Sequence, residues 1–142
     1  STCCWFKTRS GSSYPSQSIE PRSGSFQYEW WAHEPIAIRA GLPQHIADDL
    51  RQCQRPQSMD ETQALVYDFC IQLTLNHQVN DALWQKAMQL LGEQQVIDLI
   101  VLSGTYTMVS MLLNATQVGI PNQGQPPLEV LSPETIRQRL LA

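Results

Sequence analysis

The stretch Val96-Ile-Asp-Leu-Ile-Val-Leu-Ser-Gly-Thr-Tyr-Thr-Met-Val-Ser-Met-Leu-Leu113 decides the fold of this chain. When these residues are placed on a helix, apolar side chains lie on nearly every face, and a helix of this kind needs burial on all sides. A chain of 142 residues has few other elements to provide that burial. We therefore expect the chain to form a homo-oligomer in which a partner subunit covers part of this helix.

The same stretch approaches the length of a membrane span, but its composition argues against one. Between Val96 and Ala115, polar residues interrupt the apolar run at seven positions, at Asp98, Ser103, Thr105, Tyr106, Thr107, Ser110 and Asn114. A spanning helix needs about 20 predominantly apolar residues. We therefore expect no membrane partner.

Working outward from this helix, the sequence predicts an all-α protein, because the segments on either side show helical periodicity and no strand-like alternation. Glycine and proline mark the boundaries. Gly41 and Gly92 each follow a helix, Ser58 or Asp60 can cap one, and Pro35 is expected to kink the first. The predicted helices cover residues 26–40, 43–52, a third segment after Asp60, 81–91, 94–117 and a short segment from Ser132.

Three regions follow from this pattern. Residues 1–25 are rich in serine, glycine and proline and lack either period, which predicts an irregular N-terminal arm. Residues 26–121 form the helical domain, and residues 122–142 form a C-terminal loop and short helix. The arm contains no apolar leader, so the cytoplasm is the expected location.

Charge and cysteine content exclude several functions. The net charge is -4, and no cluster of lysine and arginine appears, so nucleic acid is not an expected partner. The four cysteines, Cys3, Cys4, Cys53 and Cys70, have no C-x-x-C spacing and no accompanying histidine ladder. The sequence therefore predicts no metal site.

Glu29 and His33 are the candidate catalytic residues. They are four residues apart in a predicted helix, which places both side chains on one face within reach of each other. A carboxylate beside an imidazole fixes the tautomer of the ring, and such a pair suits a general acid or base. The same spacing also occurs in ordinary surface ion pairs.

Aromatic residues surround this pair in the sequence. Tyr28, Trp30 and Trp31 are expected to pack around it and exclude water, although tryptophans also serve simply as core residues. Tyr106 is a further candidate hydroxyl donor. We expect a small-molecule substrate to contact these four side chains.

Five blocks of sequence within residues 26–121 resemble the carboxymuconolactone decarboxylase-like family, which is related to alkylhydroperoxidase D. They are Tyr28-Glu-Trp-Trp-Ala-His-Glu-Pro-Ile-Ala37 with Ala40-Gly-Leu-Pro43, Asn80-Asp81, Gly92-Glu-Gln94, Val96-Ile-Asp-Leu99 and Tyr106-Thr-Met-Val-Ser-Met-Leu-Leu-Asn114. The resemblance implies an alkylhydroperoxidase D-like helical bundle, assembled as homo-oligomers, with the site between helices.

The resemblance also implies which branch of the family this chain is closer to. The peroxidase branch carries a C-x-x-C motif, and its positions correspond to Phe26 and Glu29 here. The decarboxylase branch has a glutamate four residues before the histidine, as in this chain. It implies a cofactor-independent lyase that acts on a small carboxylated or lactone-type metabolite, with His33 exchanging the proton and Glu29 orienting the ring.

Two alternatives remain open. One is a peroxide-consuming antioxidant protein of the same superfamily that uses Cys53 or Cys70 in place of the missing motif. The other is a non-catalytic helical oligomer that binds a ligand.

Overall fold

The computed structural model describes residues 24–121, 128–129 and 131–141, and this part of the chain is all-α. It contains five helices and no strand. The helices are α1 (Gly24–Arg39), α2 (Gln44–Arg51), α3 (Glu61–Asn76), α4 (Asp81–Thr116) and α5 (Pro133–Leu141). The predicted arm lies outside the described residues up to position 23.

The first helix begins and ends close to the predicted positions. It starts at Gly24 and continues through Pro35 as one element. At its end Gly41 has a φ of 98°, its N–H donates to the carbonyl of Ile38 (3.0 Å), and the N–H of Leu42 donates to the carbonyl of Ala37 (2.9 Å). This pair of bonds is a Schellman motif, which explains why glycine follows the helix.

The next two helices have the expected boundaries, and the structure shows which of the two candidate residues caps α3. Pro43 precedes α2. Asp60 caps α3 by accepting a hydrogen bond from the N–H of Gln63 (2.8 Å), while the Gln63 side chain accepts one from the N–H of Asp60 (3.0 Å). This reciprocal capping box fixes the start of α3, so Asp60 is the cap and Ser58 is not.

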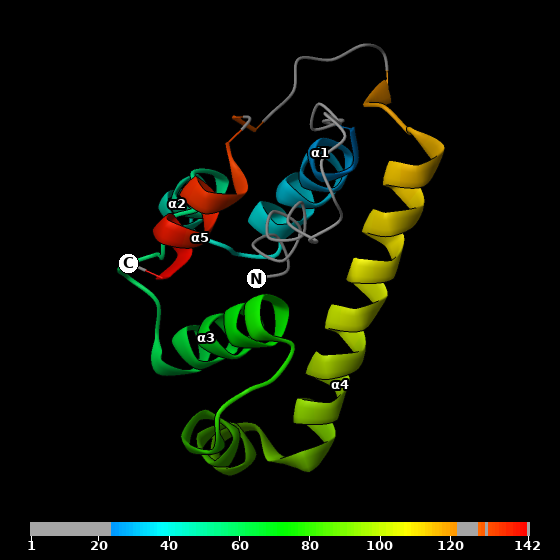
Figure 1. The fold of residues 1–142 in the computed structure, drawn as a ribbon. Coiled ribbons are helices and arrows are strands. Elements are labelled where there is room, and N and C mark those ends of the chain that lie inside the picture. The colour runs from blue at the N-terminus through cyan, green and yellow to red at the C-terminus, as the bar shows by residue number, and fades with distance from the viewer. Residues whose placement is uncertain (1–23, 122–127, 130, 142) are drawn as a thin grey trace.

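The helix α4 contains a break at Gly92, where the sequence predicted the end of one helix. The backbone there has φ 79° and ψ 164°, a combination open essentially to glycine alone. Figure 1 shows that the parts of α4 before and after the break run in different directions. The predicted helices 81–91 and 94–117 are therefore two helical arms separated by the break at Gly92, and together they make up α4.

Two hydrophobic cores hold the helices together. The larger joins α1, α2, α3 and α5, and Ile136 and Leu140 of α5 are buried in it. The smaller joins α3 to α4, with Phe69 at its centre fully buried. Helix α1 also packs against α4. As a result α1 lies between the larger core and the second arm of α4 (Figure 1).

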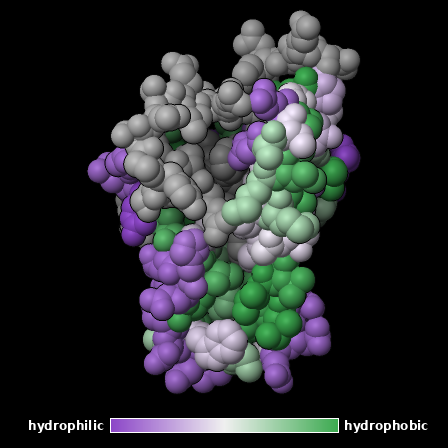
Figure 2. Space-filling view, turned by 45° about the vertical axis from the view of Figure 1, so that its right-hand side comes forward, coloured by the Kyte–Doolittle hydropathy of each residue, from purple (hydrophilic) through white to green (hydrophobic). Residues whose placement is uncertain are grey.

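The second arm of α4 keeps an exposed apolar face. The single chain leaves this face uncovered, as expected for a chain of this length, because only one side of the arm faces α1 and α3. Figure 2, which brings the α4 side forward, shows hydrophobic surface along much of the helix. We refer to six residues as the outer face of α4: Ile97 (46% exposed), Val101 (60%), Leu102 (43%), Met108 (62%), Met111 (53%) and Leu112 (61%).

By length and composition α4 is able to cross a membrane, and only 17% of its most apolar window is buried inside the chain. A single helix with this property is weak support for a membrane span. In solution or in a membrane, the apolar outer face must be shielded from water. A second copy of the chain would shield it as well as lipid would.

The break at Gly92 gives a testable prediction. Gly92→Ala is expected to lower the free energy of unfolding by roughly 1–3 kcal/mol, because an alanine strains this backbone conformation. No atom lies within 4 Å of the added methyl group, so the loss comes from the backbone alone. Gly104→Ala is the matched control, because its added methyl group also lies in open space but within a helix. This variant should raise the free energy of unfolding by about 0.5–1 kcal/mol. Equal effects in chemical denaturation would contradict a glycine-specific break.

Candidate functional site

The predicted pair Glu29 and His33 lies on the side of α1 that faces α4. The ring of His33 meets the ring of Tyr106 on α4 edge-on, with centroids 5.5 Å apart and planes 82° apart. The Glu29 side chain is 4% exposed, whereas that of His33 is 33% exposed. The carboxyl group is therefore buried, and the imidazole is accessible from outside.

The Nδ1 atom of His33 has two acceptors at almost equal distance. It lies 2.9 Å from the main-chain oxygen of Glu29 and 3.0 Å from Oε2 of the Glu29 carboxylate. A ring nitrogen carries at most one proton, and its hydrogen bond is directed to the main-chain oxygen. The Oε2 atom is consequently buried without a hydrogen bond from any described residue, although it stays in electrostatic contact with the ring.

Burial raises the pKa of the Glu29 carboxyl above its ordinary value, and the neighbouring His33 lowers it by a smaller amount. The carboxyl thus retains its proton to higher pH than an exposed glutamate does. Nδ1 of His33, which carries a proton, lies 3.0 Å from Oε2 of this carboxyl group. The two side chains form a pair that can pass a proton between them.

Tyr106 is the point at which three helices meet near this pair. Besides contacting His33, it packs in a small cluster with the thiol-bearing Cys70 of α3. Cys70 is 2% exposed, and Cys53 is 1% exposed within the larger core. Of these two cysteines, Cys70 is therefore the one that packs against Tyr106, next to the Glu29–His33 pair.

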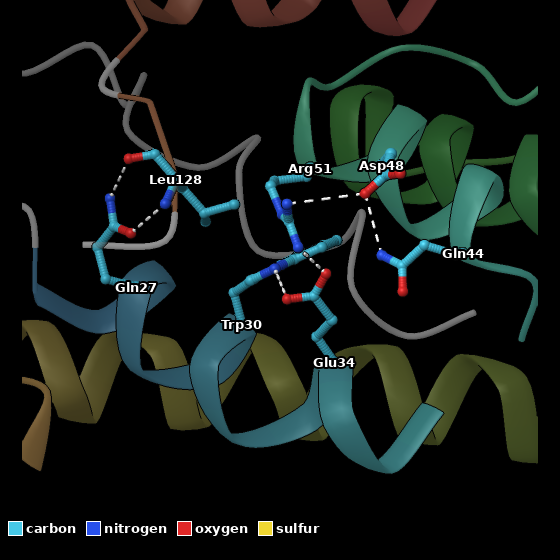
Figure 3. Close-up of polar contacts among 7 residues, drawn as sticks. All are labelled: Gln27, Trp30, Glu34, Gln44, Asp48, Arg51 and Leu128. Carbon is cyan, nitrogen blue, oxygen red and sulfur yellow. Dashed lines mark hydrogen bonds and ion pairs between the residues drawn. The ribbon is translucent and has the colours of Figure 1, made fainter. Parts of the chain in front are cut away.

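A second face of α1, about 100° around the helix from Glu29 and His33, carries a polar network of its own. The indole N–H of Trp30 donates to Oε2 of Glu34 (2.8 Å), and the other Glu34 oxygen accepts from Arg51 of α2. Arg51 also lies 3.7 Å from Asp48. Figure 3 shows these side chains bridging α1 and α2. The network ties α1 to α2 on the side away from His33.

Gln27 anchors the same face of α1 to the segment before α5. Its amide nitrogen donates to the carbonyl of Leu128 (2.9 Å), and the N–H of Leu128 donates to the Gln27 amide oxygen (2.8 Å), as Figure 3 shows. Both groups are buried, so each satisfies a polar atom that would otherwise lack a partner. The two bonds fix the rotation of α1 about its axis.

The expectation that three aromatic rings surround the Glu29–His33 pair is corrected by these contacts. Successive residues on a helix point about 100° apart, so neither Trp30 nor Trp31 shares a face with the pair. Trp30 is buried in the larger core, and Trp31 is 44% exposed. Tyr28 lies beside Trp31, with ring centroids 5.9 Å apart. Of the four side chains predicted to contact a substrate, Tyr106 is the one that contacts the Glu29–His33 pair.

The residues that orient α1 were not predicted from the sequence. The spacing of Trp30 and Glu34, four residues apart, was a signal that could have identified their contact. No local signal exists for Gln27 and Leu128, which are 101 positions apart. Their pairing depends on the tertiary fold.

The remaining histidines serve local roles. Nε2 of His45 lies 2.6 Å from the Ser58 hydroxyl on the surface, and His77 caps the end of α3 with a positive φ of 58°. Among the described residues, no three metal-ligating side chains gather at one place.

Comparison with known proteins identifies no relative of this chain. No family model matches it, and neither a curated protein nor a solved structure is significantly similar. The comparisons therefore supply no functional argument, and the proposal below uses the geometry described above together with the resemblance noted from the sequence.

The burial of Glu29 predicts a particular dependence of stability on pH. Because its pKa is raised in the folded state, the folded protein binds this proton more tightly than the unfolded chain, and unfolding free energy is lost as pH rises through the raised pKa. Glu29→Gln removes this dependence. The variant should therefore gain stability relative to the parent protein as pH rises from below the ordinary glutamate pKa towards neutrality.

Chemical denaturation across that pH range measures the effect, with Glu93→Gln as an exposed control on α4. A difference between Glu29→Gln and the parent protein that shrinks as pH rises would contradict a raised pKa.

Proposed function

We propose that this protein is a cofactor-independent lyase that acts on a small carboxylated or lactone-type metabolite through Glu29 and His33. The observation that carries the proposal is a buried carboxyl group 3.0 Å from a partly accessible imidazole, between α1 and α4. The resemblance of residues 26–121 to carboxymuconolactone decarboxylase-like proteins supports the same chemistry and an alkylhydroperoxidase D-like arrangement of the helices.

The proposed reaction divides the roles between the two residues. The carbon–carbon bond to the substrate carboxylate breaks, CO₂ leaves, and the bonding electron pair enters an enolate. Protonated His33 stabilises the enolate and returns its proton to carbon. The main-chain oxygen and Oε2 of Glu29 hold Nδ1 of His33, so Nε2 is the atom that faces the substrate. Tyr106, against the ring, limits how the imidazole can turn.

A second candidate is peroxide reduction at Cys70, favoured over Cys53 by the packing of Cys70 against Tyr106. The Cys70 thiolate would attack the O–O bond, forming a sulfenic acid and releasing water or an alcohol. A small thiol from solution would then reduce the sulfenic acid through a mixed disulfide. Tyr106 connects the two residues, because it contacts His33 and also packs against Cys70.

Self-association belongs to the proposal because the outer face of α4 supports it. Its six apolar side chains are 43–62% exposed, and burying them against a second copy is worth about 25 cal/mol per Å². A non-catalytic ligand-binding oligomer would use the same face. The non-catalytic oligomer differs from the lyase in one respect, because its function would not require the His33 side chain.

Replacing His33 tests the lyase directly. With carboxymuconolactone as the first substrate, His33→Gln should reduce CO₂ release by about 10²–10⁴-fold, the usual contribution of a general acid or base. Circular dichroism should show an intact fold. His45→Gln, a histidine outside the site, is the matched control and should leave turnover unchanged.

Full activity of His33→Gln would reject the lyase mechanism. If the parent protein instead consumes peroxide and Cys70→Ser abolishes this while Cys53→Ser does not, the second candidate is favoured.

The outer face of α4 gives a separate prediction. Val101→Glu combined with Met108→Glu should shift the protein to a monomer in sedimentation velocity, because two carboxylates at a covered apolar surface cost several kcal/mol. Gln89→Glu, an exposed change in the other arm of α4, should leave the oligomer intact. A parent protein that is already a monomer at all concentrations would refute self-association.

A further inference from the structure

Two buried oxygen atoms, one on α1 and one on α4, have no hydrogen-bond partner among the described residues. One is Oε2 of Glu29, and the other is the hydroxyl of Ser110. The residues are 4% and 7% exposed. A buried polar atom without a hydrogen bond costs about 1–3 kcal/mol. Two such atoms at one helix boundary suggest a polar group that belongs between them.

Helix geometry places the two atoms at the same level. Helices α1 and α4 run in opposite directions, since α1 begins near the end of α4 in Figures 1 and 3. His33 and Tyr106 are in contact across this boundary. Glu29 lies four residues before His33, and Ser110 lies four residues after Tyr106. In an antiparallel pair these two steps point the same way and each covers about one turn, so Glu29 and Ser110 come to face each other.

Ser103 provides the contrast on the same face of α4. It is as buried as Ser110, at 5% exposed, but its hydroxyl donates to the carbonyl of Leu99. This bond, from a serine to the carbonyl four residues earlier, is the usual fate of a serine within a helix. Ser110 does not make it, and its hydroxyl remains available to another partner.

We propose that Ser110 and Glu29 form a subsite for one hydroxyl oxygen of the substrate. A hydroxyl group fits both residues, because its oxygen accepts from Ser110 while its proton is donated to the Glu29 carboxylate. A water molecule fills the subsite when no substrate is bound. The proposal rests on the lyase site described above and narrows its substrates to acids that also carry a hydroxyl or enol group.

The subsite also gives Glu29 a second connection to the substrate. His33 Nδ1 lies 3.0 Å from Oε2 of Glu29, and this same oxygen would accept the hydrogen bond from the bound hydroxyl. Ser110 is then a positioning residue for the substrate, and Glu29 links the held hydroxyl to the imidazole.

The first experiment needs no turnover. The pKa of Glu29 is measured by NMR titration of its side-chain carboxyl carbon in the parent protein, Ser110→Ala and Ser103→Ala. Ser110→Ala should raise this pKa by roughly one unit, because the ionised carboxyl loses the hydrogen-bonded group that Ser110 holds against it. Ser103→Ala should leave the pKa unchanged. Equal responses of the two variants would overturn the subsite.

The second experiment tests the ligand class with two small acids that differ by one hydroxyl group. Glycolate and acetate are titrated into the full chain, and binding is followed by the amide shifts of α1 and α4. Glycolate should bind several-fold tighter than acetate, and Ser110→Ala should remove this advantage while Ser103→Ala retains it. Equal responses to the two acids, including no response to either, would overturn the ligand assignment.

These results are independent of the lyase test. Loss of CO₂ release in His33→Gln with no effect of Ser110→Ala on the Glu29 pKa or on glycolate binding would leave the proposed function standing and remove the subsite. The reverse pattern would keep the subsite and reject the lyase.

Discussion

The arrangement of this protein depends on how α1 is held in rotation about its axis. One face is fixed by the Trp30 indole in the larger core, by the Glu34–Arg51 contact and by the paired bonds between Gln27 and Leu128. Because the residues of a helix keep fixed angular positions, fixing that face also directs Glu29 and His33 towards α4. The candidate site therefore takes its orientation from contacts on a different face of the same helix.

Burial then divides the Glu29–His33 pair into two environments. The carboxyl group lies inside the helix boundary, where water is scarce and charge is costly, whereas the imidazole reaches the surface. Surface pairs at this spacing contribute little, since solvent screens both partners. Here one partner is screened far less than the other, and this difference makes the pair chemically distinct from an ordinary helix ion pair.

Local signals in the sequence predicted much of the fold. Gly41, Asp60 and Gly92 each marked a boundary because their conformations or side chains satisfy helix ends directly. The Glu29–His33 contact was also a local prediction and is present. What local patterns did not predict were the partners of each face of α1. Trp30 and Trp31 are adjacent in sequence but have opposite environments, and only the positions of α2, α4 and α5 decide which tryptophan is covered.

The break at Gly92 separates α4 into two rods joined at a pivot. Both rods pack against α3, and the rod after the pivot also presents Tyr106 to His33. One residue inserted between Gly92 and Tyr106 would turn the part of the second rod that follows it by about 100°. Tyr106 would then no longer meet His33, so the contact at the candidate site constrains the length of this rod between Gly92 and Tyr106.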